Sequence, residues 1–534
     1  MTHRFDSTPK ANIPRSSFDR SHGYKTTFDA GWLVPFYCDE ALPGDTFNLK
    51  TTAFARLATP IKPIMDNLFM ETFFFSVPVR QVWDNWEKFN GEQKNPTDST
   101  DFVVPKCIIS GPEAKEGTIF DYMGIPLGNA IQPNSLHFRA FNHIYNNWFR
   151  DQNLQVEAAV TTDDGPDVAS TFTMRKRRKR PDYFTSALPW AQKGDPVTLN
   201  IGGNAPVTGI GKVQNEVFDT GSLGVLESSG PVTTYTTYAE FGNDVPLGNT
   251  RLIMDGTSVD PANGRPRIFA DLSEATGITI NDLRQSFQIQ KLLERDARGG
   301  TRYPEILKSH FGVTDPMMLV TQRPEFLGGG SSMVNINPVT QTQRTGADSA
   351  DPGDTPQGNL SAFGTVTLNN HGFTKSFTEH CVLIGIVNVR ADLTYQTGLN
   401  RMWSRQTRFD YYWPALSGIG EQAIFNREIY YQDDTEVDAQ VFGYIPRYDE
   451  YRFKPSMITG KFRSTDAASL DVWHLSQKFA NLPTLGPDFI EDNPPIERVI
   501  AVQTEPQFLF DSYINLRCAR PMPLYGVPGM IDHF

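Results

Sequence analysis

The chain has 534 residues, of which 39% are hydrophobic and 21% charged. With its 42 glycines, its apolar share falls in the range of ordinary globular proteins, which excludes wholesale disorder, and its 38 prolines argue against long helical bundles. The formal net charge of −12 argues against a protein that binds nucleic acid over its whole surface.

The chain opens with a basic arm over residues 1–25. Five Lys or Arg residues against two Asp give the arm a net charge of +3, and the rest of it is rich in Ser, Thr and Pro. This composition predicts an extended segment. The N-terminus lacks the apolar core of a signal peptide, so we expect the chain to stay in the cytosol of the cell that makes it.

Strand signals follow the arm. Residues 28–60 combine apolar runs with turn residues, and residues 69–77 are dense in aromatic and β-branched side chains. A helix is predicted to begin at Asn134 or Ser135, because apolar residues then recur at helical spacing. The residues expected to face the core are Leu136, Phe141, Ile144, Tyr145, Trp148 and Phe149.

The densest cationic segment is a run of six consecutive charges. It consists of Arg175, Lys176, Arg177, Arg178, Lys179 and Arg180. Three interpretations compete: a solvated loop, a nuclear-targeting signal, or a contact with a polyphosphate through counterion release. The aromatic residues just downstream, Tyr183, Phe184 and Trp190, would stack on bases if single-stranded nucleic acid lay there. A role as core anchors is favoured for them.

Residues 191–280 differ in composition from the rest of the chain. They hold 13 Gly, 6 Pro and 11 Thr, with 10 acidic against 5 basic residues, which predicts an inserted, solvent-facing, β-rich module. A helix is predicted from a cap at Asn281 to Gly299, and Pro304 can start a shorter helix that ends at Gly312. Residues 328–364 are rich in chain-breaking residues, and we predict a long mobile loop there.

Strand signals return from residue 372 to the end. The most apolar stretch, residues 381–389, is about half the length that a membrane helix needs and is predicted to be a buried strand. The segment after Arg520 is too rich in Pro and Gly for a helix yet apolar, so we expect it to dock on a surface. Strands at both ends with helices and loops between them suit an antiparallel sandwich with expanded connections.

The sequence carries no motif of catalysis. It contains no P-loop, H-E-x-x-H or G-x-S-x-G string, and its nine histidines show no metal-ligand spacing. The acidic groups at 163–167 and 433–438 do not match a calcium loop and are interpreted as solvated loops. The four cysteines, which we expect to be reduced and structural, are Cys38, Cys107, Cys381 and Cys518. We therefore expect no catalytic site, no metal and no cofactor.

Several strings, in order along nearly the whole chain, resemble the major capsid proteins of microviruses, most closely those of the gokushovirus branch. They include RSSFDRSH at 15–22, KTTFDAG at 25–31, DEALPGDTF at 39–47, WDNWEKFNG at 83–91, DYFTSALPW at 182–190, QRPEFLGG at 322–329 and VPGMIDHF at 527–534. Their shared order is difficult to obtain by chance.

The resemblance implies a mainly β fold, an eight-stranded antiparallel viral jelly roll with long interstrand insertions that contain a few helices. About 60 copies would form a T=1 icosahedral shell around the circular single-stranded DNA genome of a bacteriophage. The expected organisation is a basic arm at 1–25, a jelly-roll core at 26–190 and 372–534, a variable surface insertion at 191–280 that forms threefold protrusions and serves host attachment, and a helical and loop insertion at 281–371.

The resemblance also implies partners and site residues. The expected partners are further copies of the chain, single-stranded DNA, a small DNA-binding protein, an internal scaffolding protein, a pilot protein and a bacterial surface receptor, without membrane insertion. Assembly into virions would take place in the bacterial host cytoplasm. The residues expected to face inward toward DNA are Arg4, Arg15, Arg20 and the run from Arg175 to Arg180. The candidate subunit contacts are Pro521, Pro523, Tyr525, Val527, Pro528, Met530 and Phe534.

A second hypothesis is a soluble carbohydrate-binding or carbohydrate-cleaving β-sandwich protein. Its support is a group of aromatic residues that would stack on sugars beside a carboxylate pair, namely Trp403, Tyr411, Tyr412 and Trp413. A role for these residues in the core or in subunit contacts is favoured, and the lack of a secretion signal also counts against a glycan-binding protein.

Overall fold

The computed structural model describes residues 14–197, 280–314, 316, 322–345 and 355–525, together with four two-residue strands between 207 and 270. The chain divides into two compact units. The first comprises Met1–Ala191 and Asp296–Phe534, and the second comprises Gln192–Arg295. In the first unit the described residues form mainly antiparallel β-sheets with few helices.

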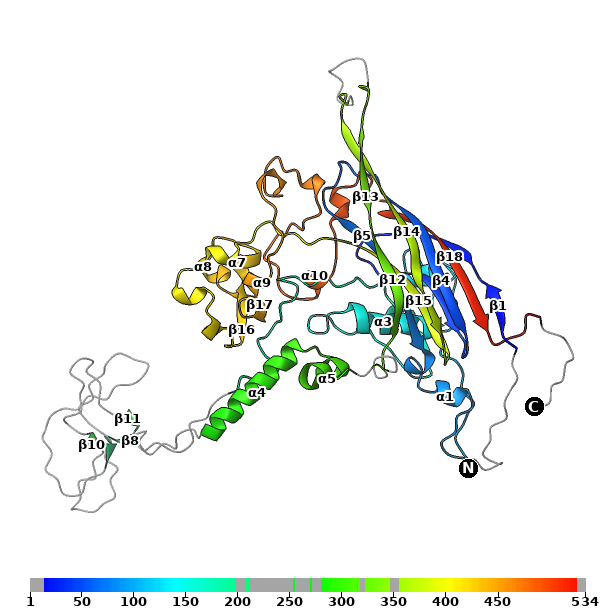
Figure 1. Ribbon diagram of the computed structural model, residues 1–534, viewed down its shortest axis with the longest axis horizontal. Helices are drawn as coiled ribbons and strands as arrows, with labels where there is room; N and C mark the ends of the chain where they lie inside the picture. Colours follow the sequence, from blue (N-terminus) through cyan, green and yellow to red (C-terminus); the bar gives the residue numbers. More distant parts are fainter. Residues whose placement is uncertain are drawn as a thin grey trace, which may run out of the picture. The chain divides into compact units, whose positions relative to one another are not determined.

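The larger sheet has six strands. Its order is β1–β18–β4–β14–β13, and β2 pairs with the same edge of β18 as β1 but farther along that strand. All neighbouring strands in this sheet are antiparallel, and β14, β4, β18 and β1 lie side by side in Figure 1. The strands are β1 (Ser16–Asp19), β2 (His22–Phe28), β4 (Thr46–Leu57), β13 (Asn335–Thr340), β14 (Leu360–Ser376) and β18 (Phe508–Arg520).

The smaller sheet has four antiparallel strands in the order β12–β5–β15–β3. They are β3 (Val34–Ala41), β5 (Leu68–Pro78), β12 (Glu325–Met333) and β15 (Cys381–Ala391). Only Val334 separates β12 from β13, so the chain passes directly from one sheet to the other there. This crossing joins the two layers at one side.

Four antiparallel pairs are nested along the chain. The outermost is β2 with β18, followed inward by β3 with β15, β4 with β14, and β5 with β12. The first and third pairs lie in the larger sheet, and the second and fourth lie in the smaller one. The strands therefore form one long antiparallel hairpin whose successive pairs alternate between two layers.

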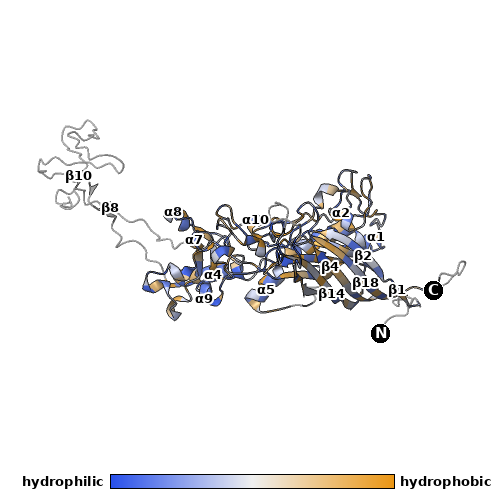
Figure 2. Cartoon of the chain, turned by 90° about the horizontal axis from the view of Figure 1, so that it is seen from above, coloured by the Kyte–Doolittle hydropathy of each residue, from blue (hydrophilic) through white to orange (hydrophobic). Residues whose placement is uncertain are grey.

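The core between the two sheets is formed by alternate side chains of the strands, which point to the same face of the sheet. Along β4, alternate residues from Phe47 to Leu57 are buried while their neighbours are exposed or half-buried, and β18 alternates in the same way from Phe508 to Cys518. Hydrophilic and hydrophobic residues are accordingly interspersed along both strands (Figure 2). Phe36, Phe74 and Phe510 pack edge to face in this core.

The outer face of the smaller sheet is covered by the insertion that follows β5. Phe75, Val77 and Ile384 pack there against α2 (Ile119–Tyr122) and α3 (Leu136–Ile144) in one hydrophobic cluster. The predicted helix is confirmed: it continues as one π-helical turn through Phe149, and the Asn134 side chain accepts a hydrogen bond from the Leu136 backbone N–H. Of its predicted core residues, only Trp148 is half-buried rather than buried.

The loop predicted for residues 328–364 is wrong over most of its described part, which forms β12, β13 and the start of β14. The glycines are used for close approach. A Cβ on Gly329 would lie 2.0 Å from the Thr72 carbonyl oxygen, and one on Gly330 would lie 2.5 Å from the His371 ring. The glycines here therefore allow close packing between strands and do not interrupt the strand.

The segment between β15 and β18 builds a third hydrophobic cluster. Ile424, Ile429 and Phe442 pack there with Tyr183 and Phe184, so the prediction that these two aromatics are core anchors is confirmed. The segment contains β16 (Glu421–Phe425), β17 (Val441–Pro446), α7 (Asn426–Ile429), α8 (Thr435–Asp438), α9 (Asp449–Arg452) and α10 (Pro487–Ile490).

The predicted helices near residues 281–312 are confirmed as α4 (Ile280–Arg298) and α5 (Tyr303–Phe311). Gly312 ends α5 with a φ of 70°, a left-handed conformation that suits glycine. In the second unit, β9 (Ile210–Gly211) pairs with β10 (Ile253–Met254), and β8 (Val207–Thr208) pairs with β11 (Phe269–Ala270). The remaining elements are β6 (Cys107–Ile108), β7 (Asp167–Val168) and α1 (Trp86–Phe89). Within the described ranges, every helix is too short or too polar to cross a bilayer.

Candidate nucleic-acid and subunit interfaces

The six-residue cationic run is an extended segment held on both sides by backbone hydrogen bonds. On one side the Leu33 N–H donates to the Arg175 carbonyl and the Arg177 N–H donates to Gly31. On the other side the Asp492 N–H donates to the Arg177 carbonyl, and the Lys179 N–H donates to Ile490. The run therefore ties the start of the sandwich to the segment that precedes β18.

The side chains of the run have partners within the chain. Arg177 and Arg180 both pair with Glu71, and Arg178 lies 3.5 Å from Asp151. Lys176 sits over the Trp32 ring, and Arg175 sits over Tyr145. Of the six residues, Arg178 is exposed, Lys179 is buried and the other four are half-buried. The contact with DNA predicted for this run stays a prediction, and the geometry gives most of its charges an internal role.

Burial shifts the pKa values of this cluster. It lowers the pKa of Lys179 to about 8 and raises the pKa of Asp492 to about 6, and the charge of each group opposes the shift of the other. Burial also favours the neutral form of Glu71, but hydrogen bonds and charge from Arg177 and Arg390 hold its pKa below the usual value. The run is thus part of a partly buried electrostatic network.

Two of the other predicted DNA-facing arginines, Arg15 and Arg20, lie beside the N-terminal strands. Arg15 is exposed and donates a hydrogen bond to the Thr46 hydroxyl at the edge of the larger sheet. Arg20 makes a two-bond ion pair with Asp39 at 2.7 and 2.9 Å. Arg4 lies outside the described residues.

The predicted subunit contacts at the C-terminus are described only in part. Pro521 lies against Gly44, whereas Pro523 is exposed and Tyr525 is 79% exposed. The apolar side chains between them, Met522 and Leu524, are exposed as well. Val527, Pro528, Met530 and Phe534 lie outside the described residues.

A second exposed apolar region contains aromatic residues for which the sequence favours a role in the core or in subunit contacts over sugar binding. Tyr411, Tyr412, Trp413 and Tyr451 are each between 41% and 52% exposed, so they do not lie in the core. The Arg405 guanidinium lies 4.2 Å from the Tyr451 ring centroid and 5.6 Å from that of Tyr411, and Arg408 lies 4.5 Å from that of Trp413. Trp403 and Phe409, 71% and 68% exposed, flank this group in the chain. We call these eight residues the aromatic–arginine surface.

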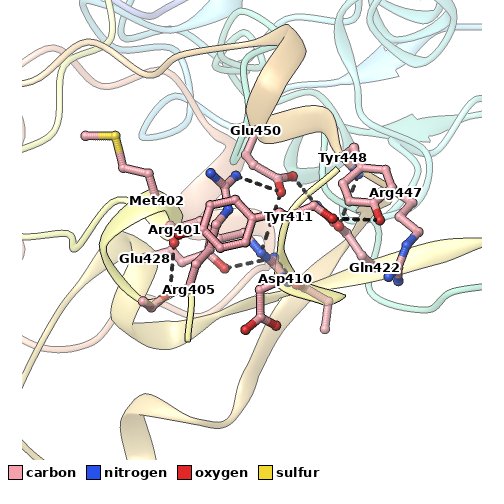
Figure 3. Close-up of polar contacts among 12 residues, drawn as sticks. Arg401, Met402, Arg405, Asp410, Tyr411, Gln422, Glu428, Arg447, Tyr448 and Glu450 are labelled. Carbon is pink, nitrogen blue, oxygen red and sulfur yellow. Dashed lines mark hydrogen bonds and ion pairs between the residues drawn. The ribbon is translucent and has the colours of Figure 1, made fainter. Parts of the chain in front are cut away.

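A buried ion network supports this surface (Figure 3). Glu450 accepts from Arg405 at 3.3 Å and from the Gln422 amide at 2.6 Å, and Arg401 lies 3.2 Å from Glu428. Burial raises the pKa of Glu428, although the Arg401 charge opposes this effect. The network fixes Arg405, which lies over the Tyr411 and Tyr451 rings.

The acidic groups singled out in the sequence have structural partners. Asp167 binds the fully buried Arg139 through two hydrogen bonds of 2.6 and 2.9 Å, and Asp164 accepts from the Trp83 indole at 2.7 Å. Asp434 caps α8 by accepting from the Glu436 and Val437 N–H groups. Across the described residues, His, Cys, Asp and Glu side chains form no group of three or more that could hold a metal ion.

The described residues form a two-layer antiparallel β-sandwich protein with expanded connections and exposed aromatic surfaces. A family model described as "Capsid protein (F protein)" matches residues 7–530. The chain is 46% identical to the capsid protein VP1 of Bdellovibrio phage phiMH2K over all of its length and 98% of the relative. It is 42% identical to VP1 of Chlamydia phage 1 and 37% identical to VP1 of Spiroplasma virus 4, with coverage of at least 97% of each protein.

The chain belongs to the capsid F protein family of the microviruses, and its relatives are gokushovirus capsid proteins. It is a major capsid protein of single-stranded DNA phages, a non-enzymatic structural component of the virion that assembles as a multimer. The predicted family, the predicted role as a major capsid protein and the predicted location in the virion are confirmed.

Proposed function

We propose that the chain is a jelly-roll subunit of a T=1 shell of about 60 copies that encloses a circular single-stranded DNA genome. The observation that carries the proposal is the nested pairing of β2 with β18, β3 with β15, β4 with β14 and β5 with β12. A long antiparallel hairpin rolled up so that its pairs alternate between two sheets is the topology of a jelly roll.

Contacts between copies use two exposed apolar regions, the aromatic–arginine surface and residues 521–525. Both regions expose several large apolar side chains close together in the chain, and contiguous exposed apolar patches mark sites of protein interaction. Tyr, Trp and Arg are also the residues enriched at the buried centre of protein interfaces. The unit Gln192–Arg295 is a surface insertion that attaches the particle to its host. Its support is that these residues form a compact unit of their own and that residues 191–280 have a distinct composition.

The remaining partners are a small basic DNA-binding protein, an internal scaffolding protein and a pilot protein. The net charge of −12 supports the first of these, because a chain with an excess of acids supplies little net neutralisation for a packaged genome.

Electron microscopy of the purified chain tests the shell. The protein is imaged alone and with its scaffolding partner and circular single-stranded DNA, at low and high salt. We expect uniform icosahedral particles with threefold knobs. A monodisperse monomer or dimer under all these conditions would contradict the proposal.

A deletion tests the role of the insertion. The Lys193 N–H lies 3.4 Å from the Leu293 carbonyl oxygen, so the two ends of residues 194–292 are adjacent and a short Gly/Ser linker can replace them. We expect the variant to assemble and to lose adsorption to host cells. Assembly with unchanged adsorption would remove the attachment role.

A further inference from the structure

Within the described part of the chain, the second face of the larger sheet is exposed to solvent. Leu509, Phe54 and Tyr513 lie on this face and are 54%, 49% and 55% exposed, whereas the residues next to them in their strands are buried. The equivalent face of the smaller sheet is covered by α2 and α3. Among the residues that the structure describes, no element covers this face, which is about four strands wide and is formed by β2, β18, β4 and β14. We call it the open face.

The open face is cationic although the whole chain is acidic. Its basic side chains are Arg15 at the edge, Lys25, Lys50, Arg56 and Arg517. Its acids are Asp19 and Asp511, and the latter pairs with Lys25 at 2.8 Å. The remaining outward positions of β4, β18 and β14 are mostly amides and hydroxyls, among them Asn48, Thr52, Asn515, Thr367 and Thr374. A surplus of three positive charges on a chain of net charge −12 complements a polyanion.

The register places the two aromatic rings beside the cations. Phe54 is directly opposite Asp511, and Tyr513 is opposite Thr52, so the rings occupy diagonal positions on neighbouring strands. Diagonal neighbours lie about 7–8 Å apart, within reach of one another. Lys50 faces Asn515 next to this pair, and Arg56 faces Leu509 on its other side. The rings are therefore flanked by positive charge along β4.

We propose that this open face binds single-stranded nucleic acid, with bases stacked on Phe54 and Tyr513 and phosphates bound by Lys50, Arg56 and Arg517. Exposed aromatic rings on a sheet, bordered by Lys and Arg, are the general means by which β-sheets hold single strands without sequence preference. The inference rests on the proposed function, because it makes this face the genome-facing side of the shell.

The composition favours nucleic acid over a second copy of the chain as the occupant. Lys is depleted from the buried centre of protein–protein interfaces, whereas Lys25 and Lys50 lie on this face together with the rings. On this face Thr52 lies between Lys50 and Phe54 along β4, and Asn515 lies between Tyr513 and Arg517 along β18. These neutral groups suit contacts with sugar and phosphate oxygens.

The test measures the affinity of the purified, unassembled full-length chain for a fluorescent 20-nucleotide oligo(dT) by anisotropy over a range of NaCl concentrations. The stacking variant is Phe54→Ile with Tyr513→Ile, which keeps strand propensity and apolar character but removes the rings. The charge variant is Lys50→Gln, Arg56→Gln and Arg517→Gln. Its matched control is Lys115→Gln, Lys454→Gln and Lys461→Gln, three exposed lysines outside the sheet.

We expect the stacking variant to bind about 5- to 150-fold more weakly for each base lost, because that is the range of a base–aromatic contact. The charge variant should reduce the steepness of log Kobs against log salt by about two, at about 0.7 for each phosphate contact, while the control leaves the slope unchanged. Circular dichroism and electron microscopy of assembled particles establish that the variants fold and assemble.

Wild-type affinity in both variants would overturn the proposal, as would a wild-type chain that assembles but does not bind oligo(dT). Variants that bind oligo(dT) normally but fail to assemble would identify the face as a subunit interface and would also overturn it. A wild-type chain that fails to assemble under any condition would count against the proposed shell, and the oligo(dT) comparison would still decide this proposal.

Discussion

Buried cations in this protein are used mainly for internal structure. Arg139 is fully buried and binds Asp167 through two hydrogen bonds, with further bonds to the Val82 and Asp163 carbonyl oxygens. Lys179 is also buried and donates to Gln477 and to the Phe489 carbonyl. The charge of such residues is visible in the sequence, but whether it faces DNA or a carboxylate depends on partners that are distant in the chain.

We predict that Arg139→Met destabilises the subunit by about 3–5 kcal/mol, because Asp167 is left as a buried charge without its partner. The change is measured as the loss of unfolding free energy in urea. Arg178→Gln is the control, since its exposed pair with Asp151 contributes less than about 1 kcal/mol. Equal effects of the two substitutions would contradict the buried-pair interpretation.

Asp492 should give the subunit a specific pH dependence. Its pKa is raised to about 6 from 3.8, so the folded chain retains a proton that the unfolded chain releases, and this contribution to stability is lost as the pH rises from about 4 to 6. The Asp492→Asn side chain does not titrate, so its unfolding free energy lacks this decrease. Relative to that of the wild type, we expect the unfolding free energy of the variant to rise by roughly 3 kcal/mol between pH 4 and pH 7. Unfolding free energies that run parallel for the two proteins across this range would refute the assignment.

At the scale of elements, the strand that crosses between the sheets depends on glycine. In β12, Gly329 faces the Thr72 carbonyl oxygen and Gly330 faces the His371 ring so closely that neither has space for a Cβ. His371 is in turn held by Thr72 at 2.9 Å. The same residues that suggest a loop in the sequence permit two sheets to meet.

We predict that Gly329→Ala destabilises the subunit by about 1–3 kcal/mol or more, because the new methyl group would lie 2.0 Å from backbone that cannot move without breaking the β5–β12 ladder. Gly418→Ala is the matched control, since its Cβ meets open space. The urea midpoint should fall for the first variant only. An unchanged midpoint for Gly329→Ala would show that β12 can shift freely.

At the scale of the whole molecule, the exposed surfaces decide how copies associate. The sandwich buries its own core, so removing exposed side chains of the aromatic–arginine surface should leave the subunit folded. Trp403 and Phe409 are its most exposed members. Substitution of these two residues therefore tests the role of the surface in assembly without disturbing the fold.

We predict that Trp403→Ser with Phe409→Ser abolishes or strongly reduces shell formation, because buried aromatic anchors dominate the energy of protein interfaces. Particle yield is measured by sedimentation, and folding by circular dichroism. Tyr303→Ser, at another site that is 60% exposed, controls for the loss of an exposed ring. Normal particle yield from the double variant would exclude this surface from the subunit contacts.

The sequence by itself determined the family, the β-rich class, the helix after Ser135 and the absence of catalytic motifs. These depend on local periodicity, or on strings such as those at 182–190 and 322–329 that can be matched without knowing what they touch. Tertiary structure alone decided that residues 328–333 form a strand, that Arg177 and Arg180 pair with Glu71, and that one face of the larger sheet is exposed in the described part of the chain. The physical reason is that burial and charge neutralisation depend on contacts between segments far apart in the chain, and Glu71 lies more than a hundred residues from Arg177.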